Sequence, residues 1–212
     1  MTDSSNEPLT ELWLVRHGQT DWNLQGRYQG HSDIPLNATG LTQALEMAAL
    51  IEGARIQAIY SSDLLRAHTT AQAVADKWRL PIHSEPRLRE VNLGAWEGLQ
   101  LSEIQARYAA NWAERQRDPL YSRPIEGESI YDVAQRVWPA VDEIAARHTP
   151  GPVLVVAHGL ALATLICGAT NTPLSRAYEM IPENAAVTFV HWPSRSARLL
   201  EALAPVAELE HS

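Results

Sequence analysis

Two stretches decide the fold of this chain: Leu12-Trp13-Leu14-Val15, which runs into Arg16-His17-Gly18, and Val153-Leu154-Val155-Val156, which runs into Ala157-His158-Gly159. Each begins as a short apolar run, typical of a strand that is buried on both faces. Each then delivers a histidine–glycine step. Ligands of open α/β sheets bind beyond the carboxyl ends of the strands. The sequence therefore predicts two imidazoles in one crevice, with an arginine beside the first.

Strand-like and helix-like segments alternate along the rest of the chain. Strands are predicted at 12–15, 56–60, 80–83 and 153–157, and helices at 41–51, 64–78, 102–116, 128–147 and 160–167. Ser61-Ser62-Asp63 offers N-cap residues for the second helix, and Pro139 is a candidate kink or break in the fourth. Segments 186–192 and 198–202 read as a terminal hairpin. The alternation predicts an α/β fold with a largely parallel sheet that the hairpin makes mixed.

The length and composition are those of one globular domain. The chain has 212 residues, of which 45% are hydrophobic and 20% charged. No apolar run approaches the roughly 20 residues that span a bilayer. We expect a flexible leader at 1–10, without the features of a signal peptide, a single domain at 11–205 and a tail at 206–212. Cys167 is the only cysteine, which excludes an intramolecular disulfide and favours a cytoplasmic location.

The formal net charge of −8 argues against nucleic acid or an anionic membrane as partner. It does not argue against a small anionic ligand. Exposed charges farther apart than about 10 Å are largely screened, so a local group of arginines can outweigh the net charge. Lys77 is the only lysine, so almost all of the basic residues are arginines.

Several sequence blocks, in order along residues 12–164, resemble the histidine phosphatase superfamily, the family of cofactor-dependent phosphoglycerate mutases and their phosphatase relatives. The blocks are Leu14–Thr20 with Trp22-Asn23, Gln29–Leu36, Gly40–Ala44, Ser61–Ala67 with Thr70-Ala71, Leu88–Glu90 with Gly94–Gly98, Gly127–Ser129 and Val156–Gly159. The resemblance implies a three-layer α/β/α sandwich with a mostly parallel, mixed central sheet. It also implies a small helical cap, inserted at about 92–127.

The resemblance implies that His17 is a nucleophile that forms a phosphohistidine. Phosphoryl transfer needs an in-line nucleophile, cationic support for the phosphoryl oxygens and a proton donor for the leaving oxygen. Arg16 and Arg66 would bind phosphoryl oxygens through their planar guanidinium groups. Because positive charge disfavours imidazolium, the same arginines would lower the pKa of His17 and keep it unprotonated.

Other residues of the same blocks would bind the phosphoryl group. His158 would donate a hydrogen bond to it, and the Gly159 N–H would assist from a helix N-terminus. Asn23 would add a neutral donor. Gln29 and Gly30 correspond to positions that line the phosphate loop in the family.

Glu90 is the candidate general acid and base, which would protonate the leaving alcohol and then activate the hydrolytic water. Glu97, in the Trp-Glu-Gly turn, is expected to have a structural role. The remaining histidines show no metal-ligand spacing. The phosphate chemistry that these residues would perform requires no metal, and we expect no cofactor.

The resemblance leaves the reaction open between phosphatase and mutase. The mutases usually carry a longer insertion after the Glu90 equivalent, with a lysine and paired arginines for the substrate carboxylate. Here no lysine follows Lys77, and Arg115 and Arg117 are not adjacent. The segment is short, and its ending at 124–129 looks like the phosphatase branch. The sequence therefore predicts a phosphomonoesterase; the alternatives are a 2,3-bisphosphoglycerate-dependent phosphoglycerate mutase and a phospho-ligand-binding protein with little turnover.

The predicted partner is a small phosphorylated metabolite, with sugar phosphates, bisphosphorylated sugars and α-ribazole phosphate as candidates. The resemblance also suggests a homodimer, because the mutase relatives often pair. Five aromatic residues near the predicted cap either admit a less polar leaving group or pack the cap: Trp22, Tyr28, Trp96, Tyr108 and Trp112.

Overall fold

The computed structural model describes residues 9–192. Its centre is a five-stranded sheet in the order β3-β2-β4-β1-β5. Strands β1 (Thr10–Arg16), β2 (Ala58–Ser61), β3 (Ile82–Ser84) and β4 (Val153–Ala157) are parallel, and β5 (Val187–Trp192) is antiparallel to β1. The predicted mixed sheet is thus confirmed. The second strand of the predicted hairpin, at 198–202, lies outside the described residues, as do the tail and most of the leader.

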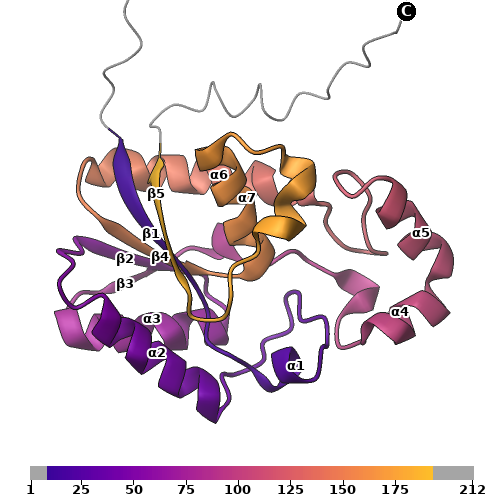
Figure 1. Ribbon diagram of the computed structural model, residues 1–212, viewed down its shortest axis with the longest axis horizontal. Helices are drawn as coiled ribbons and strands as arrows, with labels where there is room; N and C mark the ends of the chain where they lie inside the picture. The colour runs from indigo at the N-terminus through magenta and orange to yellow at the C-terminus, as the bar shows by residue number, and fades with distance from the viewer. Residues whose placement is uncertain (1–8, 193–212) are drawn as a thin grey trace, which may run out of the picture.

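Helices cover both faces of the sheet, which makes three layers (Figure 1). One face carries α2 (Ala38–Leu50) and α3 (Leu65–Trp78), and the other carries α6 (Ile130–His148) and α7 (Gly159–Thr170). The short α1 (Asp21–Leu24) follows β1. Within the described residues there are also three 3-10 helices, at Pro86–Leu88, Gly94–Trp96 and Leu174–Met180. Two further helices, α4 (Leu101–Arg107) and α5 (Ala109–Arg117), stand to the side of the sheet as the expected cap.

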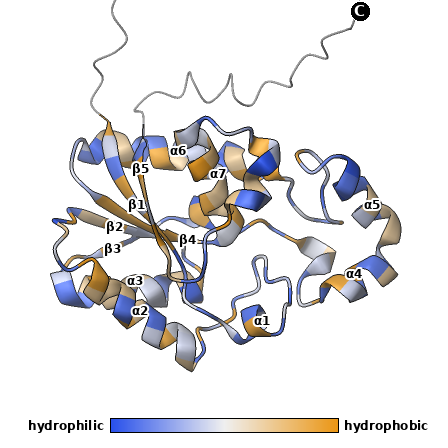
Figure 2. Cartoon of the chain, viewed as in Figure 1, coloured by the Kyte–Doolittle hydropathy of each residue, from blue (hydrophilic) through white to orange (hydrophobic). Residues whose placement is uncertain are grey.

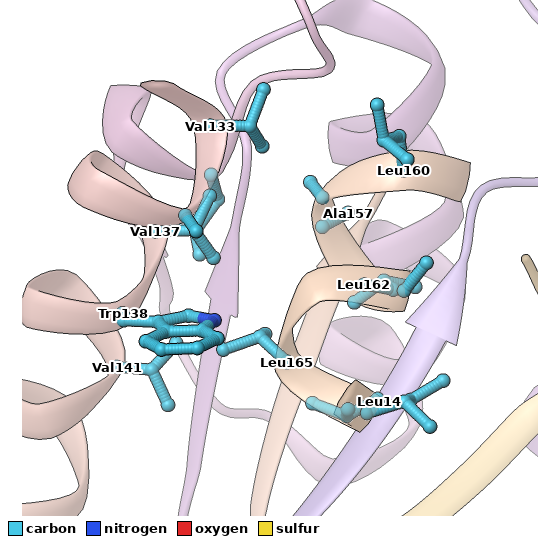
Figure 3. Packing of buried hydrophobic residues seen from close by; sticks show 14 of the residues in the cluster. Leu14, Val133, Val137, Trp138, Val141, Ala157, Leu160, Leu162 and Leu165 are labelled. Carbon is cyan, nitrogen blue, oxygen red and sulfur yellow. The ribbon is translucent and has the colours of Figure 1, made fainter. Parts of the chain in front are cut away.

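The larger part of the core lies between the sheet and the α6–α7 pair. The side chains of Val137, Trp138 and Val141 line the side of α6 that packs against α7, and Leu165 of α7 reaches toward Trp138 (Figure 3). These four side chains and that of Leu162 on α7 are buried. Full burial of one such side chain contributes about 1.5–3 kcal/mol. The strand β4 is hydrophobic along its whole length (Figure 2), as expected for a central strand covered by helices on both faces. The core thereby fixes the carboxyl ends of β1 and β4.

Two predicted helices differ from the structure. The helix predicted at 102–116 is broken at Tyr108, which has φ −126° and ψ 37°, into α4 and α5. No glycine or proline marks this break in the sequence, and Tyr108 packs against the core there. Conversely, α6 continues through Pro139. Proline has no N–H, so the Gln135 carbonyl loses its helical hydrogen bond. Both residues lie on the exposed face of the helix, where water can bond that carbonyl.

The N-cap predicted for α3 was also wrong. Leu64 occupies the cap position and provides no side-chain hydrogen bond. Instead the Leu65 N–H donates to Asp33 Oδ1 at 2.7 Å. Ser61 and Ser62 are therefore not used as caps, and Ser62 points toward the site described below. Within residues 9–192, no helix combines the length and apolar character needed to cross a membrane.

Candidate active site

The two histidine–glycine steps lie side by side at one edge of the sheet. Strands β1 and β4 are neighbours, and their register pairs Arg16 with Ala157, so His17 and His158 follow at the same level. Their ring centroids are 5.2 Å apart, and both side chains are buried. The crevice predicted from the strand ends is therefore formed.

A hydrogen bond orients the His17 ring. Nδ1 lies 2.7 Å from the carbonyl oxygen of Gly18. A carbonyl oxygen only accepts, so Nδ1 carries the proton and Nε2 of the neutral ring has a lone pair available for attack. The pKa of His17 is well below its usual value, mainly because of burial and secondly because of the Arg66 charge. Arg16 has the smallest lowering effect, so burial outranks the arginine charges that the sequence suggested.

Close backbone contact explains the glycine after His17. A Cβ on Gly18 would lie 2.4 Å from the carbonyl oxygen of Gly40, at the start of α2. The Gly18 N–H donates to Thr70 Oγ1 at 3.0 Å, which ties the same turn to α3. Gly18, whose carbonyl orients His17, is thus positioned by contacts with α2 and with α3.

Arg66 is fully buried and holds the loop that precedes α2. Its Nη1 donates to the Ser32 carbonyl at 2.7 Å and its Nη2 to the Gly30 carbonyl at 2.8 Å. Burial lowers the pKa of Arg66 to about 10, so the side chain remains charged at neutral pH. Gly30 has φ +52°, and a Cβ there would lie 2.2 Å from Glu97 Oε1. Gly30 therefore meets both a conformational and a steric demand for glycine.

Three buried nitrogens near His17 have no hydrogen-bond partner within residues 9–192: Arg16 Nε, Arg66 Nε and His158 Nδ1. Arg16 is anchored by a 2.8 Å bond from Nη1 to the Pro182 carbonyl. Burial lowers the pKa of Arg16, although Glu90 and Glu183 oppose the effect. Both arginine Nε atoms carry a hydrogen; buried donors without partners are costly, and they are satisfied when an anion with several acceptor oxygens binds.

Polar residues of the α1 segment complete this side of the site. The Thr20 hydroxyl lies 3.1 Å from both Asn23 Oδ1 and Gln29 Oε1. The Asn23 Oδ1 accepts from Thr20 and from Asn184 Nδ2. The Nδ2 group of Asn23 is therefore the part of this side chain that can donate to a ligand. Asn184 also donates to the His17 carbonyl at 2.9 Å. Sequence reasoning missed Asn184, which lies far from the motif blocks.

Glu90 connects the site to the first turn of α7. Its carboxylate accepts the backbone N–H groups of Leu160 and Ala161 at 3.2–3.3 Å and of Val91 at 2.9 Å. Two N–H groups at the start of α7 are thus bonded to Glu90. The sequence predicted that this helix end would assist phosphate binding through Gly159 and did not predict its bonds to Glu90.

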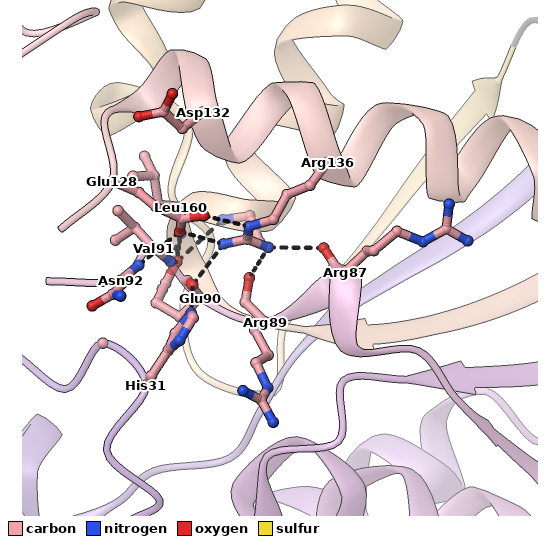
Figure 4. A network of polar contacts seen from close by, with 12 residues as sticks. His31, Arg87, Arg89, Glu90, Val91, Asn92, Glu128, Asp132, Arg136 and Leu160 are labelled. Atoms are coloured by element: carbon pink, nitrogen blue, oxygen red, sulfur yellow. Dashed lines mark hydrogen bonds and ion pairs between the residues drawn. The ribbon is translucent and has the colours of Figure 1, made fainter.

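The backbone beside Glu90 is held by Arg136 of α6. Its guanidinium donates to the carbonyls of Arg87, Arg89 and Glu90 at 2.7–2.8 Å and pairs with Glu128 (Figure 4). Glu97 has the structural role predicted for it: it accepts the His31 N–H and the Ser32 hydroxyl.

These side chains surround a cavity of about 300 Å³. Of the nine site residues that the sequence predicts, eight line it: Arg16, His17, Asn23, Gln29, Gly30, Arg66, Glu90 and Gly159. The ninth, His158, does not line the cavity itself, but its ring centroid lies 5.2 Å from that of His17. Trp22 and Tyr28 also line the cavity, together with Tyr178 and Ile181, whereas Trp96 is buried in the core. Among the described residues, no group of three or more histidine, cysteine, aspartate or glutamate side chains could hold a metal ion.

A second cavity of about 370 Å³ shares Tyr28 and Tyr178 with the first. Arg115 of α5 lines it and is 6% exposed. Its guanidinium lies over the rings of Trp96 and Tyr178, and it makes no ion pair with any described residue. Its Nη1 is buried without a hydrogen-bond partner there, and burial lowers its pKa to about 10.

The family model of the histidine phosphatase superfamily (branch 1) matches residues 12–203. The chain belongs to this superfamily. Among its superfamily relatives, "Phosphoserine phosphatase 1" of Hydrogenobacter thermophilus is 30% identical over 91% of this chain and 92% of its own. "Probable phosphoglycerate mutase GpmB" of Proteus mirabilis is 32% identical over 87% and 86%.

Solved structures of the superfamily share the fold. The mycobacterial glucosyl-3-phosphoglycerate phosphatase superimposes with a TM-score of 0.77 at 34% identity, over 85% of this chain and 90% of its own. Relatives of similar identity thus include proteins named as phosphatases and proteins named as mutases.

Proposed function

We propose that the protein is a phosphomonoesterase that hydrolyses small phosphorylated metabolites through a phosphohistidine on His17. One observation carries the proposal: three buried nitrogens without partners, on Arg16, Arg66 and His158, lie around an imidazole whose Nε2 is oriented for attack. A phosphoryl group supplies the oxygens that these nitrogens lack. Such preorganised donors stabilise the charge on a phosphoryl group in transfer.

The reaction proceeds in two displacements. His17 Nε2 attacks phosphorus, the P–N bond forms, and the bond to the leaving oxygen breaks as the Glu90 carboxyl group gives that oxygen a proton. A water then attacks phosphorus and transfers a proton to Glu90, the P–N bond breaks, and phosphate and neutral His17 are released. Arg16 and Arg66 bind the phosphoryl oxygens in both steps. A protein that only binds phosphorylated ligands needs neither an imidazole oriented for attack nor a carboxylate beside it in the same cavity, so the combination of His17 and Glu90 argues against that alternative.

Phosphoglycerate mutase activity is the second candidate function, and the environment of Arg115 favours it. A buried guanidinium without a carboxylate partner beside the cavity suits the acid group of a phosphoglycerate. Against this candidate, no lysine follows Lys77, and Arg117 is not adjacent to Arg115. We therefore favour water as the acceptor.

One experiment separates these candidates. The protein is incubated with an aryl phosphate and, separately, with 3-phosphoglycerate plus 2,3-bisphosphoglycerate, and released phosphate and 2-phosphoglycerate are measured. We expect hydrolysis in the first reaction, abolished in a His17→Ala variant. Interconversion of phosphoglycerates much faster than any hydrolysis would overturn the phosphatase proposal, and full activity of the variant would overturn the mechanism.

A further inference from the structure

Ser62 is hydrogen-bonded to His158 and has no role in the mechanism proposed for the site. Its Oγ lies 2.8 Å from His158 Nε2, and both residues are fully buried. The Ser62 N–H donates to the Val156 carbonyl at 3.0 Å, which fixes the serine beside the strand that leads to His158. The Leu64 N–H donates to the Ser62 Oγ at 3.3 Å. The hydroxyl proton of Ser62 therefore has one acceptor available in its surroundings, the imidazole.

We propose that Ser62 is a positioning residue that sets the tautomer of His158: the serine hydroxyl donates to Nε2, so that the proton of the ring is on Nδ1 and is presented to the phosphoryl group. The part that concerns the phosphoryl group rests on the proposed function. The assignment of the tautomer itself concerns the free protein and stands on the hydrogen bonds alone.

A count of hydrogen-bonding groups favours this tautomer before any ligand binds. If Ser62 donates to Nε2, the serine proton and the Nε2 lone pair are both satisfied, and only Nδ1–H lacks a partner among residues 9–192. If Nε2–H donates to Ser62 instead, the serine proton loses its acceptor and the Nδ1 lone pair is still unpaired. The second arrangement leaves one more buried group unsatisfied, which is disfavoured.

The ligand increases the difference between the two tautomers. Phosphoryl oxygens that carry negative charge accept hydrogen bonds, so Nδ1–H is attractive to them and a lone pair at Nδ1 is repulsive. The pKa of His158 is well below its usual value, mainly because of burial, so the ring carries a single proton at neutral pH. One buried hydroxyl thereby determines whether that proton faces the substrate.

The neighbouring serine provides a matched control. Ser61 is also fully buried, but its hydroxyl donates to the Ser62 backbone carbonyl at 2.8 Å and does not contact His158. Ser61→Ala and Ser62→Ala remove the same atom from adjacent positions. With an aryl phosphate as substrate, we expect kcat/KM to fall about 10–100-fold in Ser62→Ala, since about one charge-assisted hydrogen bond is lost. Ser61→Ala should stay within about threefold of the wild type, and Ser62→Thr should recover part of the loss because it retains a hydroxyl.

Nitrogen-15 NMR of the histidine rings tests the tautomer directly. In the wild type, with and without inorganic phosphate, we expect His158 to be protonated at Nδ1 and not at Nε2, and in Ser62→Ala a mixture of both forms. A wild-type His158 protonated at Nε2 overturns the proposal without any variant, so the test survives a variant that fails to fold. Unchanged kcat/KM in Ser62→Ala also overturns it. If the wild type hydrolyses no phosphate ester while His158 is protonated at Nδ1, the proposed function fails and the assignment of the tautomer stands.

Discussion

Replacement of Arg136 tests whether the backbone beside Glu90 is held by one side chain. Arg136 bridges three carbonyl oxygens and the Glu128 carboxylate, with 19% of its side chain exposed and 23% of its partner's. Truncation to methionine removes these bonds and leaves Glu128 without its cation. Loss of one member of such a pair, with the bonds to the carbonyls, costs about 3–5 kcal/mol. That is a large share of the 5–15 kcal/mol typical of a domain.

The measurement is denaturant unfolding of the wild type, Arg136→Met and Arg136→Lys, together with kcat on an aryl phosphate. Lysine retains the charge, but its ammonium group has three N–H donors and cannot replace the five hydrogen bonds of the Arg136 guanidinium, so we expect an intermediate loss of stability. The control is Arg123→Met. Arg123 makes an equally well-formed pair with Asp132, but its own side chain is 60% exposed and donates to no backbone carbonyl among the described residues, so its loss should change the unfolding midpoint little. Arg136→Met and Arg123→Met variants that unfold at the same denaturant concentration would refute this reasoning.

Three further predictions concern burial in and around the site. Burial lowers the pKa of His17 and that of His158. Below about pH 6.5 the unfolded state therefore binds more protons than the folded state, and the free energy of unfolding falls as the pH decreases, by about 1.4 kcal/mol per pH unit for each ring. Urea unfolding between about pH 5 and 7 checks the slope, which should decrease in His17→Gln; an unchanged slope contradicts the assignment. Arg115→Met should leave stability unchanged or raised, because a buried charge without an ion pair is replaced by an apolar chain; a clear drop in the thermal unfolding midpoint would show that the contacts with Trp96 and Tyr178 outweigh burial. Gly30→Ala should lower the free energy of unfolding by about 1–3 kcal/mol, because of the positive φ and the 2.2 Å distance that a Cβ would have from Glu97 Oε1. It should also weaken the inhibition of aryl phosphate hydrolysis by added inorganic phosphate, because the Gly30 carbonyl orients Arg66; inhibition equal to that of the wild type would argue against this link.

The sequence was most informative where short apolar runs end in polar residues. Parallel strands bring their carboxyl ends to one edge, so His17 and His158 could be paired although they are 141 positions apart in the printed sequence. The motif blocks then identified eight residues that do line the cavity. These inferences needed only the local pattern and its order along the chain.

What could not be predicted depends on tertiary contacts with no local pattern. Nothing in the sequence links Ser62 to His158 or Arg136 to the Glu90 carbonyl, because these contacts arise only when distant elements pack. The break at Tyr108 has no glycine or proline to mark it. The main cause of the lowered pKa of His17 was missed for the same reason, since burial depends on the packed fold whereas charged neighbours can be read from a motif.

The hydrogen bonds of Glu90 to the first turn of α7 have an evolutionary consequence. Many enzymes become more stable when a catalytic residue is replaced, because the site strains the fold. Glu90, the proposed general acid and base, also caps a helix that packs in the centre of the protein, so its replacement would remove a helix cap as well as the proposed proton transfer. A lineage that no longer needs the reaction gains nothing in folding by losing this glutamate, and a carboxylate at position 90 is accordingly weak evidence, taken alone, that a homologue is still an active enzyme.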